Sequence, residues 1–300
     1  MTADAVKPDA WLAPPDPPSR PRYPAPAGAI DSHAHVFGPL ARYPLAPGAS
    51  YRTPDLPVAA YLAMLARIGF ARGVLVQPSA YALDNGALLA ALAAAPERLR
   101  GIAVAKASIT DGELAAWQAA GVRGLRFSQF AAGAAHGFSG TVGFEDFAEL
   151  APRLRALGWQ AQIWTRAELF AAAAERLLAP GVPLVLDHMG HFDPRAGLND
   201  ASFRLVLRLL GEGRIWVKLP VYRNSQAFPD YEDCRPFHDA LVRANPERLV
   251  WGTDWPHVGL KRDMPDVGRL VDLFAAWVEG DGLRRKILVE NPARLYGFTP

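Results

Sequence analysis

Eight short runs rich in β-branched and aromatic residues recur along this 300-residue chain, each followed by a longer segment of helical period or by a loop. Such runs indicate strands, and the segments between them indicate helices. The predicted strands are residues 29–36, 72–79, 100–107, 121–128, 159–166, 182–190, 214–220 and 248–256. Strict alternation of strand and helix indicates parallel strands joined by right-handed crossovers. Eight such units in roughly 250 residues predict a closed (β/α)8 TIM barrel.

The competing α/β fold is an open, doubly wound sheet. That fold more often carries a glycine-rich phosphate loop after its first strand, and the sequence here is "DSHAHVFG" instead. Residues 1–27 hold so many prolines that helix and strand pairing are both blocked, so we expect a flexible or wrapping arm. Residues 28–300 are then one (β/α)8 barrel.

Composition narrows the function classes. Acidic and basic residues interleave and the net charge is only +2, so no nucleic-acid surface is expected. Cys234 is the single cysteine, which excludes an internal disulfide and a cysteine-rich metal site. The sequence has no run of ~18 apolar residues of the kind that indicates a membrane span. We therefore expect a cytoplasmic protein. The sequence leaves a homo-oligomer open.

Polar residues close most of the predicted strands, where the active sites of TIM barrels lie. Five of the seven histidines lie at or just beyond three strand ends. In the first strand, the i, i+2 spacing of Asp31, His33 and His35 predicts that all three project to one face. The strand-end residues are His33, His35, Gln77, Ser79, Lys106, Arg126, Ser128, Gln162, Trp164, Asp187, His188, Lys218, Asp254 and His257.

The ordered set of these motifs resembles the amidohydrolase superfamily. The histidine pair, a late-strand histidine and the aspartate of "WGTDWPH" are similar to that superfamily as a whole. More narrowly, "DSHAHVFGP", "VLVQPSAYALDN", "GVRGLRFS", "DHMG" and "VKLPVYRNS" resemble the branch that contains 2-pyrone-4,6-dicarboxylate lactonase and related lactone hydrolases. The similarity runs from about residue 29 to "ILVENPARLYGF" near the end.

The resemblance implies roles that suit lactone hydrolysis. Opening a lactone needs an activated water, a polarised carbonyl and a proton for the departing oxygen. Asp254 is the expected general base, and His33, His35 and His188 would polarise the carbonyl, directly or through a metal. The structural alternative for Asp254 is a helix cap or a partner of a buried arginine.

A metal requirement is the sharpest question that the motifs raise. His33, His35, His188 and Asp254 are enough ligands by count for one Zn²⁺ or Mn²⁺. Metal-dependent members of the superfamily generally add a histidine on strand five, where this chain has Gln162 and Trp164. The lactonase branch is regarded as working without a metal. We therefore expect no cofactor, with one divalent ion as the alternative.

Substrate-binding residues follow from the same motifs and imply a small anionic lactone as the partner. Arginine pairs with carboxylates in a two-pronged way, and serine and tyrosine hydroxyls can add hydrogen bonds. The expected substrate-binding residues are Tyr51, Ser79, Arg126, Gln162, Trp164, His191, Arg223, Ser225 and His257.

Three departures from the lactonase pattern bear on the substrate. His191 stands where the pattern "DHMGR" has an arginine, Trp164 stands where a tyrosine is favoured, and residues 130–137 lack a clamping arginine. A 2-pyrone-4,6-dicarboxylate-like substrate is thereby in doubt, and a muconolactone-like lactone or an aldonolactone fits better. The alternative functions are a metal-dependent decarboxylase of an aromatic acid, a sugar-diacid lactone isomerase and a non-catalytic binding protein.

Overall fold

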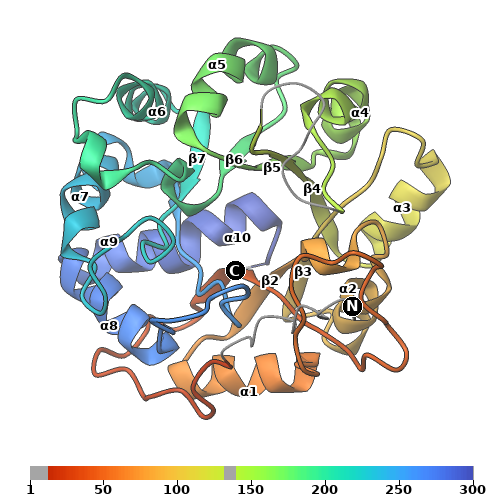
Figure 1. The fold of residues 1–300 in the computed structure, drawn as a ribbon, viewed down its shortest axis with the longest axis horizontal. Helices are drawn as coiled ribbons and strands as arrows, with labels where there is room; N and C mark the ends of the chain where they lie inside the picture. Colours follow the sequence, from red (N-terminus) through yellow and green to blue (C-terminus); the bar gives the residue numbers. More distant parts are fainter. Residues whose placement is uncertain (1–12, 132–139, 300) are drawn as a thin grey trace, which may run out of the picture.

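The computed structural model describes residues 13–131 and 140–299. Eight parallel strands form one sheet in the order of the sequence, and the sheet curls into a nearly closed barrel (Figure 1). The predicted (β/α)8 barrel is confirmed. The strands are β1 (Ile30–Ala34), β2 (Arg72–Val76), β3 (Leu99–Ala103), β4 (Val122–Gln129), β5 (Gln160–Thr165), β6 (Leu184–Leu186), β7 (Ile215–Lys218) and β8 (Leu249–Val250).

The segment after β8 closes the barrel against β1. The backbone nitrogen of Ser32 donates to the carbonyl of Trp251 at 3.0 Å, and that of His35 donates to the carbonyl of Trp255 at 2.8 Å. In the opposite direction, the nitrogen of Asp254 donates to the carbonyl of His33 at 2.7 Å. This pairing holds Asp254 beside the two histidines that it was predicted to work with.

Helices surround the strands (Figure 1). The longer helices bury an apolar face against the barrel, as in α4, where Phe144, Phe147, Leu150 and Leu154 recur at helical spacing. None of the helices in the described ranges is both long and apolar enough to span a membrane. The helices are α1 (Val58–Ile68), α2 (Gly86–Ala94), α3 (Asp111–Ala119), α4 (Phe144–Leu157), α5 (Ala167–Leu178), α6 (Ala201–Gly211), α7 (Arg235–Ala244), α8 (Val267–Trp277), α9 (Asp281–Arg285) and α10 (Asn291–Tyr296).

Helix α10 covers the end of the barrel at which the strands begin. Tyr296 and Phe298 pack against Ile30, Val74 and Ile102, which are apolar side chains of β1 to β3. Filling this end with apolar side chains leaves the opposite end, where the strands finish, for polar groups.

The described part of the proline-rich segment, residues 13–27, forms no helix or strand and lies against the barrel's outer helices. The backbone nitrogen of Arg22 donates to Asp272 of α8 at 2.6 Å. The Arg67 side chain of α1 donates to the carbonyl of Pro18 at 3.0 Å. In the described residues this segment therefore wraps two helices.

A bulge in β1 corrects one prediction. The pairing of β1 with β2 shifts register between Asp31 and Ala34, so the i, i+2 alternation breaks there. The Asp31 carboxylate points to the outer layer, where it accepts hydrogen bonds from Tyr61 of α1 and from Thr253. Asp31 therefore does not share a face with His33, whose ring points into the barrel.

Candidate active site

A cavity of about 310 Å³ opens at the carboxyl ends of the strands. It brings together nine of the predicted site residues, which come from strands and loops that are far apart in the sequence. Its lining is His35, Ser50, Tyr51, Pro78, Ser79, Arg126, Trp164, His188, His191, Arg223, Asp254, Val258 and Gly259.

Asp254 is the most densely contacted acid of this cavity. Its Oδ1 lies 3.3 Å from Nε2 of His35 and 3.7 Å from Nε2 of His33. Its Oδ2 accepts hydrogen bonds from the hydroxyl of Tyr222 at 2.5 Å and from Nε of Arg223 at 2.8 Å. One carboxylate oxygen is thus fixed by two donors, and the other faces the histidines.

The surroundings keep Asp254 ionised. Burial favours the neutral acid, but the Arg223 guanidinium and the neighbouring histidines outweigh it and hold the pKa of Asp254 well below its usual range. Burial lowers the pKa of His33 to about 3, with help from the Lys218 cation, and lowers the pKa of His188 well below its usual value. A carboxylate base therefore faces neutral His33 and His188 near pH 7.

The tautomer of His35 follows from its partner. Nδ1 of His35 lies 2.8 Å from the carbonyl oxygen of Val76. A carbonyl only accepts, so Nδ1 carries a proton, and Nε2 is the ring nitrogen that faces Asp254. Nε2 of His35 and Oδ1 of Asp254 consequently face each other at 3.3 Å.

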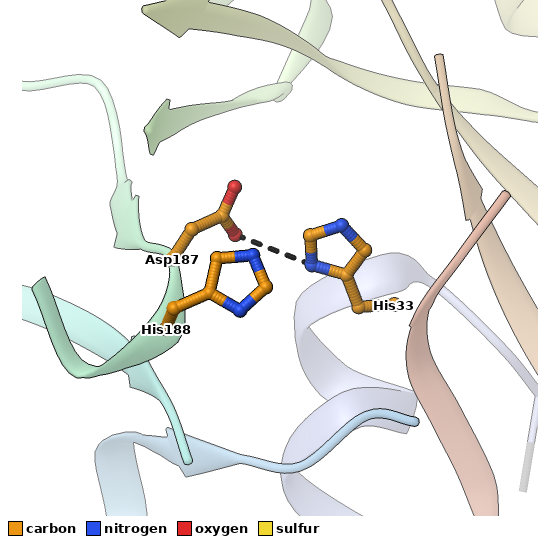
Figure 2. Close-up of side chains that lie close together, drawn as sticks. All are labelled: His33, Asp187 and His188. Atoms are coloured by element: carbon orange, nitrogen blue, oxygen red, sulfur yellow. Dashed lines mark ion pairs between the residues drawn. The ribbon is translucent and has the colours of Figure 1, made fainter. Parts of the chain in front are cut away.

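A second buried cluster lies beside His33. Lys218 of β7 forms an ion pair with Oδ1 of Asp187 at 3.3 Å and donates to Oε1 of Gln162 at 2.7 Å. Asp187 Oδ2 accepts from Nε2 of Gln162 at 2.9 Å and lies 3.3 Å from Arg126. Figure 2 shows the ring of His33 pointing at Asp187 and His188 from the opposite side of the barrel. Lys218 and Asp187 thus form a buried pair directly behind the histidines.

One wall of the cavity is suited to an anion. Arg126 is only 6% exposed, and its Nε has no hydrogen-bond partner among the described residues. Arg223 lies on the same cavity, with the hydroxyls of Tyr51 and Ser79 nearby. Burial raises the pKa of Tyr51 to about 12, so its hydroxyl stays protonated. Two guanidinium groups with neighbouring hydroxyls match a carboxylate.

The wall on the β5 side is aromatic. The indole N–H of Trp164 donates to Nε2 of His191 at 3.0 Å, and Phe130 packs edge-on against both rings. Arg126 lies over the Trp164 ring at 4.3 Å. Burial and nearby arginines lower the pKa of His191 to about 4. This wall therefore offers a neutral imidazole and ring surface where the lactonase pattern has an arginine.

Four non-glycine residues in the cavity or next to it have a positive φ. The φ values of His188, His191, Asp254 and His257 are 48°, 46°, 55° and 62°. Such conformations cost on the order of 1 kcal/mol each or more, and they cluster at functional sites. Their concentration after β6 and β8 is independent support for a functional site here.

Two groups of buried side chains have the spacing of a metal site, with ligand atoms within 4.8 Å of one another. In both groups a cation already contacts the ligands. The Lys218 ammonium lies within 3.4 Å of both His33 and Asp187, and Arg223 holds Asp254. The donor atoms suit Zn²⁺ or Mn²⁺, whereas the fixed cations oppose a further positive charge. The groups are His33, Asp187, His188 and His33, His35, Asp254.

Three predicted substrate-binding residues lie away from the cavity. The Ser225 hydroxyl donates to Asp233, because the loop after β7 folds on itself. Gln162 is fully buried in the cluster with Lys218, and His257 is fully buried and packs edge-on against Tyr222. None of the three lines the cavity, and their assignment to the substrate stays a prediction. His136, in the predicted 130–137 loop, lies outside the described residues.

Sequence reasoning gave no role to Lys218, Asp187 and Tyr222. Lys218 and Asp187 each close an apolar strand, which is the signal that marks them as strand-end residues. Tyr222 precedes Arg223 in the "VYRNS" motif, and no pattern distinguishes it from a core tyrosine. Their importance follows from proximity between strands, which the sequence does not display.

Known proteins match this chain over nearly its full length. A 4-sulfomuconolactone hydrolase of Rhizobium radiobacter is 37% identical over 275 residues, 91% of each chain. A 2-pyrone-4,6-dicarboxylate hydrolase of Comamonas testosteroni is 37% identical over 292 residues, 93% of each chain. A D-galactarolactone isomerase of Agrobacterium fabrum is 29% identical over 280 residues, 92% of this chain and 93% of that one.

The fold comparison agrees with the sequence comparison. A solved structure from Agrobacterium tumefaciens superposes with a TM-score of 0.83 at 28% identity, covering 93% of this chain and 99% of that one. A sequence profile of the amidohydrolase family matches residues 30–298. The chain therefore belongs to the amidohydrolase family.

Proposed function

We propose that this enzyme hydrolyses a carboxylated lactone. The observation that carries the proposal is Asp254, an ionised and buried carboxylate whose free oxygen faces His33 and His35 at a cavity that also holds Arg126 and Arg223. The names of the two hydrolase relatives agree with this chemistry. A cytoplasmic location is part of the proposal.

The arrangement assigns one step to each group. A water held beside Nε2 of His35 donates to Oδ1 of Asp254, and Asp254 takes its proton as the oxygen attacks the lactone carbonyl. N–H groups of His33 and His188 stabilise the charge that develops on the carbonyl oxygen. The ring C–O bond then breaks, and the proton on Asp254 passes to the departing oxygen. The products are a free hydroxyl or enol and a new carboxylate.

The charges of the site favour a substrate with one carboxylate. Lys218, Arg126 and Arg223 supply three positive charges, and Asp187 and Asp254 supply two negative ones. The surplus of one positive charge is neutralised by a monoanion, whereas a dianion would leave an uncompensated negative charge in a buried site. A muconolactone-like lactone or an aldonolactone acid fits this count better than 2-pyrone-4,6-dicarboxylate.

We propose further that the reaction needs no metal. Lys218 and Arg223 already contact both groups of candidate ligands, and polarisation of the carbonyl can come from imidazole N–H donors. The alternative is one Zn²⁺ or Mn²⁺ held by His33, His35, His188 and Asp254.

The test is turnover of a lactone panel by metal-stripped enzyme in the presence of a chelator. The panel holds 2-pyrone-4,6-dicarboxylate, a muconolactone and an aldonolactone acid, and base uptake in a pH-stat reports the acid released by ring opening. Turnover in chelator supports the proposal. Turnover that appears only after Zn²⁺ or Mn²⁺ is restored refutes the metal-free part, and no turnover of any lactone refutes the hydrolase.

A lactone isomerase is the second candidate, because one relative is named as such and needs the same base and donors. In isomerisation a substrate hydroxyl, rather than water, attacks the carbonyl. No net acid is released, so loss of the starting lactone without base uptake would identify it.

A further inference from the structure

Lys218 is the most deeply buried cation of the site. Its side chain is 0% exposed, and it contacts three groups: Gln162 Oε1 at 2.7 Å, Asp187 Oδ1 at 3.3 Å and His33 Nδ1 at 3.4 Å. An ammonium has three N–H donors and no acceptor, so these three acceptors match it in number. Because a buried charge is costly unless it is fully paired, this complement indicates a fixed position for the ammonium.

The contact with His33 has a consequence for that ring. Nδ1 of His33 can accept from Lys218 only if Nδ1 carries no proton. The proton of the neutral ring is then on Nε2, which lies 3.7 Å from Asp254 Oδ1 and has no other partner among the described residues. His33 becomes an N–H donor toward the Asp254 carboxylate.

The competing contact leads to the opposite tautomer. Nδ1 of His33 also lies 3.6 Å from Oδ1 of Asp187, to which it could donate. In that case Nε2 of His33 would turn a lone pair toward Oδ1 of Asp254, which Nε2 of His35 also faces. A lone pair that faces a carboxylate oxygen is repulsive unless a cation lies between them, which is the arrangement of a metal site.

We propose that Lys218 is a positioning residue that selects the Nε2–H tautomer of His33 and thereby keeps divalent metal out of the site. The inference rests on the metal-free hydrolysis proposed above, but its two readouts do not use lactone turnover. The Lys218 side chain itself reaches no reacting atom; it acts through His33.

The first experiment reads the tautomer in the unaltered protein. Long-range ¹H–¹⁵N spectra of metal-stripped enzyme distinguish a protonated from an unprotonated ring nitrogen, and the signals of His33 are assigned by their loss in His33→Gln. A proton on Nε2 supports the proposal. A proton on Nδ1 overturns it, and this result does not depend on whether Lys218→Met folds.

The second experiment removes the ammonium. Lys218→Met and the matched control Lys106→Met, whose lysine is exposed, are dialysed against Zn²⁺ and then against buffer, and bound zinc is counted by mass spectrometry. We expect about one retained zinc per chain in Lys218→Met, held by histidine and carboxylate ligands, and little in the control or wild type. Folded Lys218→Met that retains no more zinc than wild type contradicts the proposal.

Discussion

Replacing Asp254 by asparagine is expected to abolish most of the catalysis while leaving the site assembled. Asparagine keeps the size of the side chain and an oxygen that can still accept from Tyr222 and Arg223, so the change removes the charge and the base together. A positioned general base contributes about 10²–10⁴-fold to a rate. At about 1.4 kcal/mol per tenfold, that is about 3–5 kcal/mol of activation free energy.

The same change has a smaller cost in stability. Arg223 is 19% exposed in its side chain and loses a charged partner, while one hydrogen bond of the pair survives. Hydrogen bonds to charged groups contribute about 1.5–3 kcal/mol, and the lower end applies here because the amide oxygen still accepts. At about 2–4 °C per kcal/mol for a domain of this kind of size, the melting temperature should fall by about 3–6 °C.

The assay is steady-state kinetics on whichever panel lactone wild type turns over, with thermal melts of the same samples. Asp193→Asn is the matched control, because it removes an aspartate that pairs only with exposed Arg195. We expect a fall in kcat with little change in KM for Asp254→Asn and neither effect for the control. A folded Asp254→Asn enzyme with kcat within tenfold of wild type would refute the assignment of the base.

Three further predictions concern pH and packing. Arg223 lowers the pKa of Asp254, and activity is lost as the pH falls through that pKa because the base becomes protonated. Arg223→Met should therefore move the acid limb of the pH profile of kcat/KM to higher pH. An acid limb at the same pH as in wild type would contradict this. A Cβ on Gly252 would lie 2.5 Å from the backbone nitrogen of His33. Gly252→Ala should therefore lower the free energy of unfolding in urea by about 1–3 kcal/mol. An unchanged urea midpoint would show that β1 shifts to accommodate the methyl group without loss of stability. Burial raises the pKa of Asp31 to about 6. As the pH rises from about 4 to 6, the free energy of unfolding of wild type should therefore fall by about 3 kcal/mol relative to that of Asp31→Asn. Parallel plots of unfolding free energy against pH for the two proteins would contradict this.

The sequence was sufficient for the fold because each strand is an apolar run bounded by a helix. Every predicted strand overlaps an observed one, and the sequential order of the sheet follows from right-handed crossovers. The strand ends also located the cavity, since nine predicted residues line it. Periodicity carries this information along the chain without any knowledge of distances.

Other features depend on distances that a pattern does not contain. Asp31 has the i, i+2 spacing that should place it on the same face as His33 and His35. The bulge that follows Asp31 breaks this alternation, and Asp31 faces the outer layer. Lys218 and Gln162 come from β7 and β5, on either side of β6, so their hydrogen bond cannot be read from either strand. His257 lies in a recognisable motif, but its backbone turns the ring beneath Tyr222.

The closure of the barrel and the chemistry of the site depend on the same few residues after β8. The backbone of Asp254 bonds to that of His33, and the lack of a side chain at Gly252 is what allows the two segments to approach so closely. The left-handed φ of Asp254 then turns its carboxylate across the pair of histidines. A substitution that weakens the backbone pairing between β1 and the segment after β8 should therefore lower stability and catalysis together. Changes at Arg126 or Trp164, on the far wall of the cavity, should alter substrate preference and leave this pairing intact.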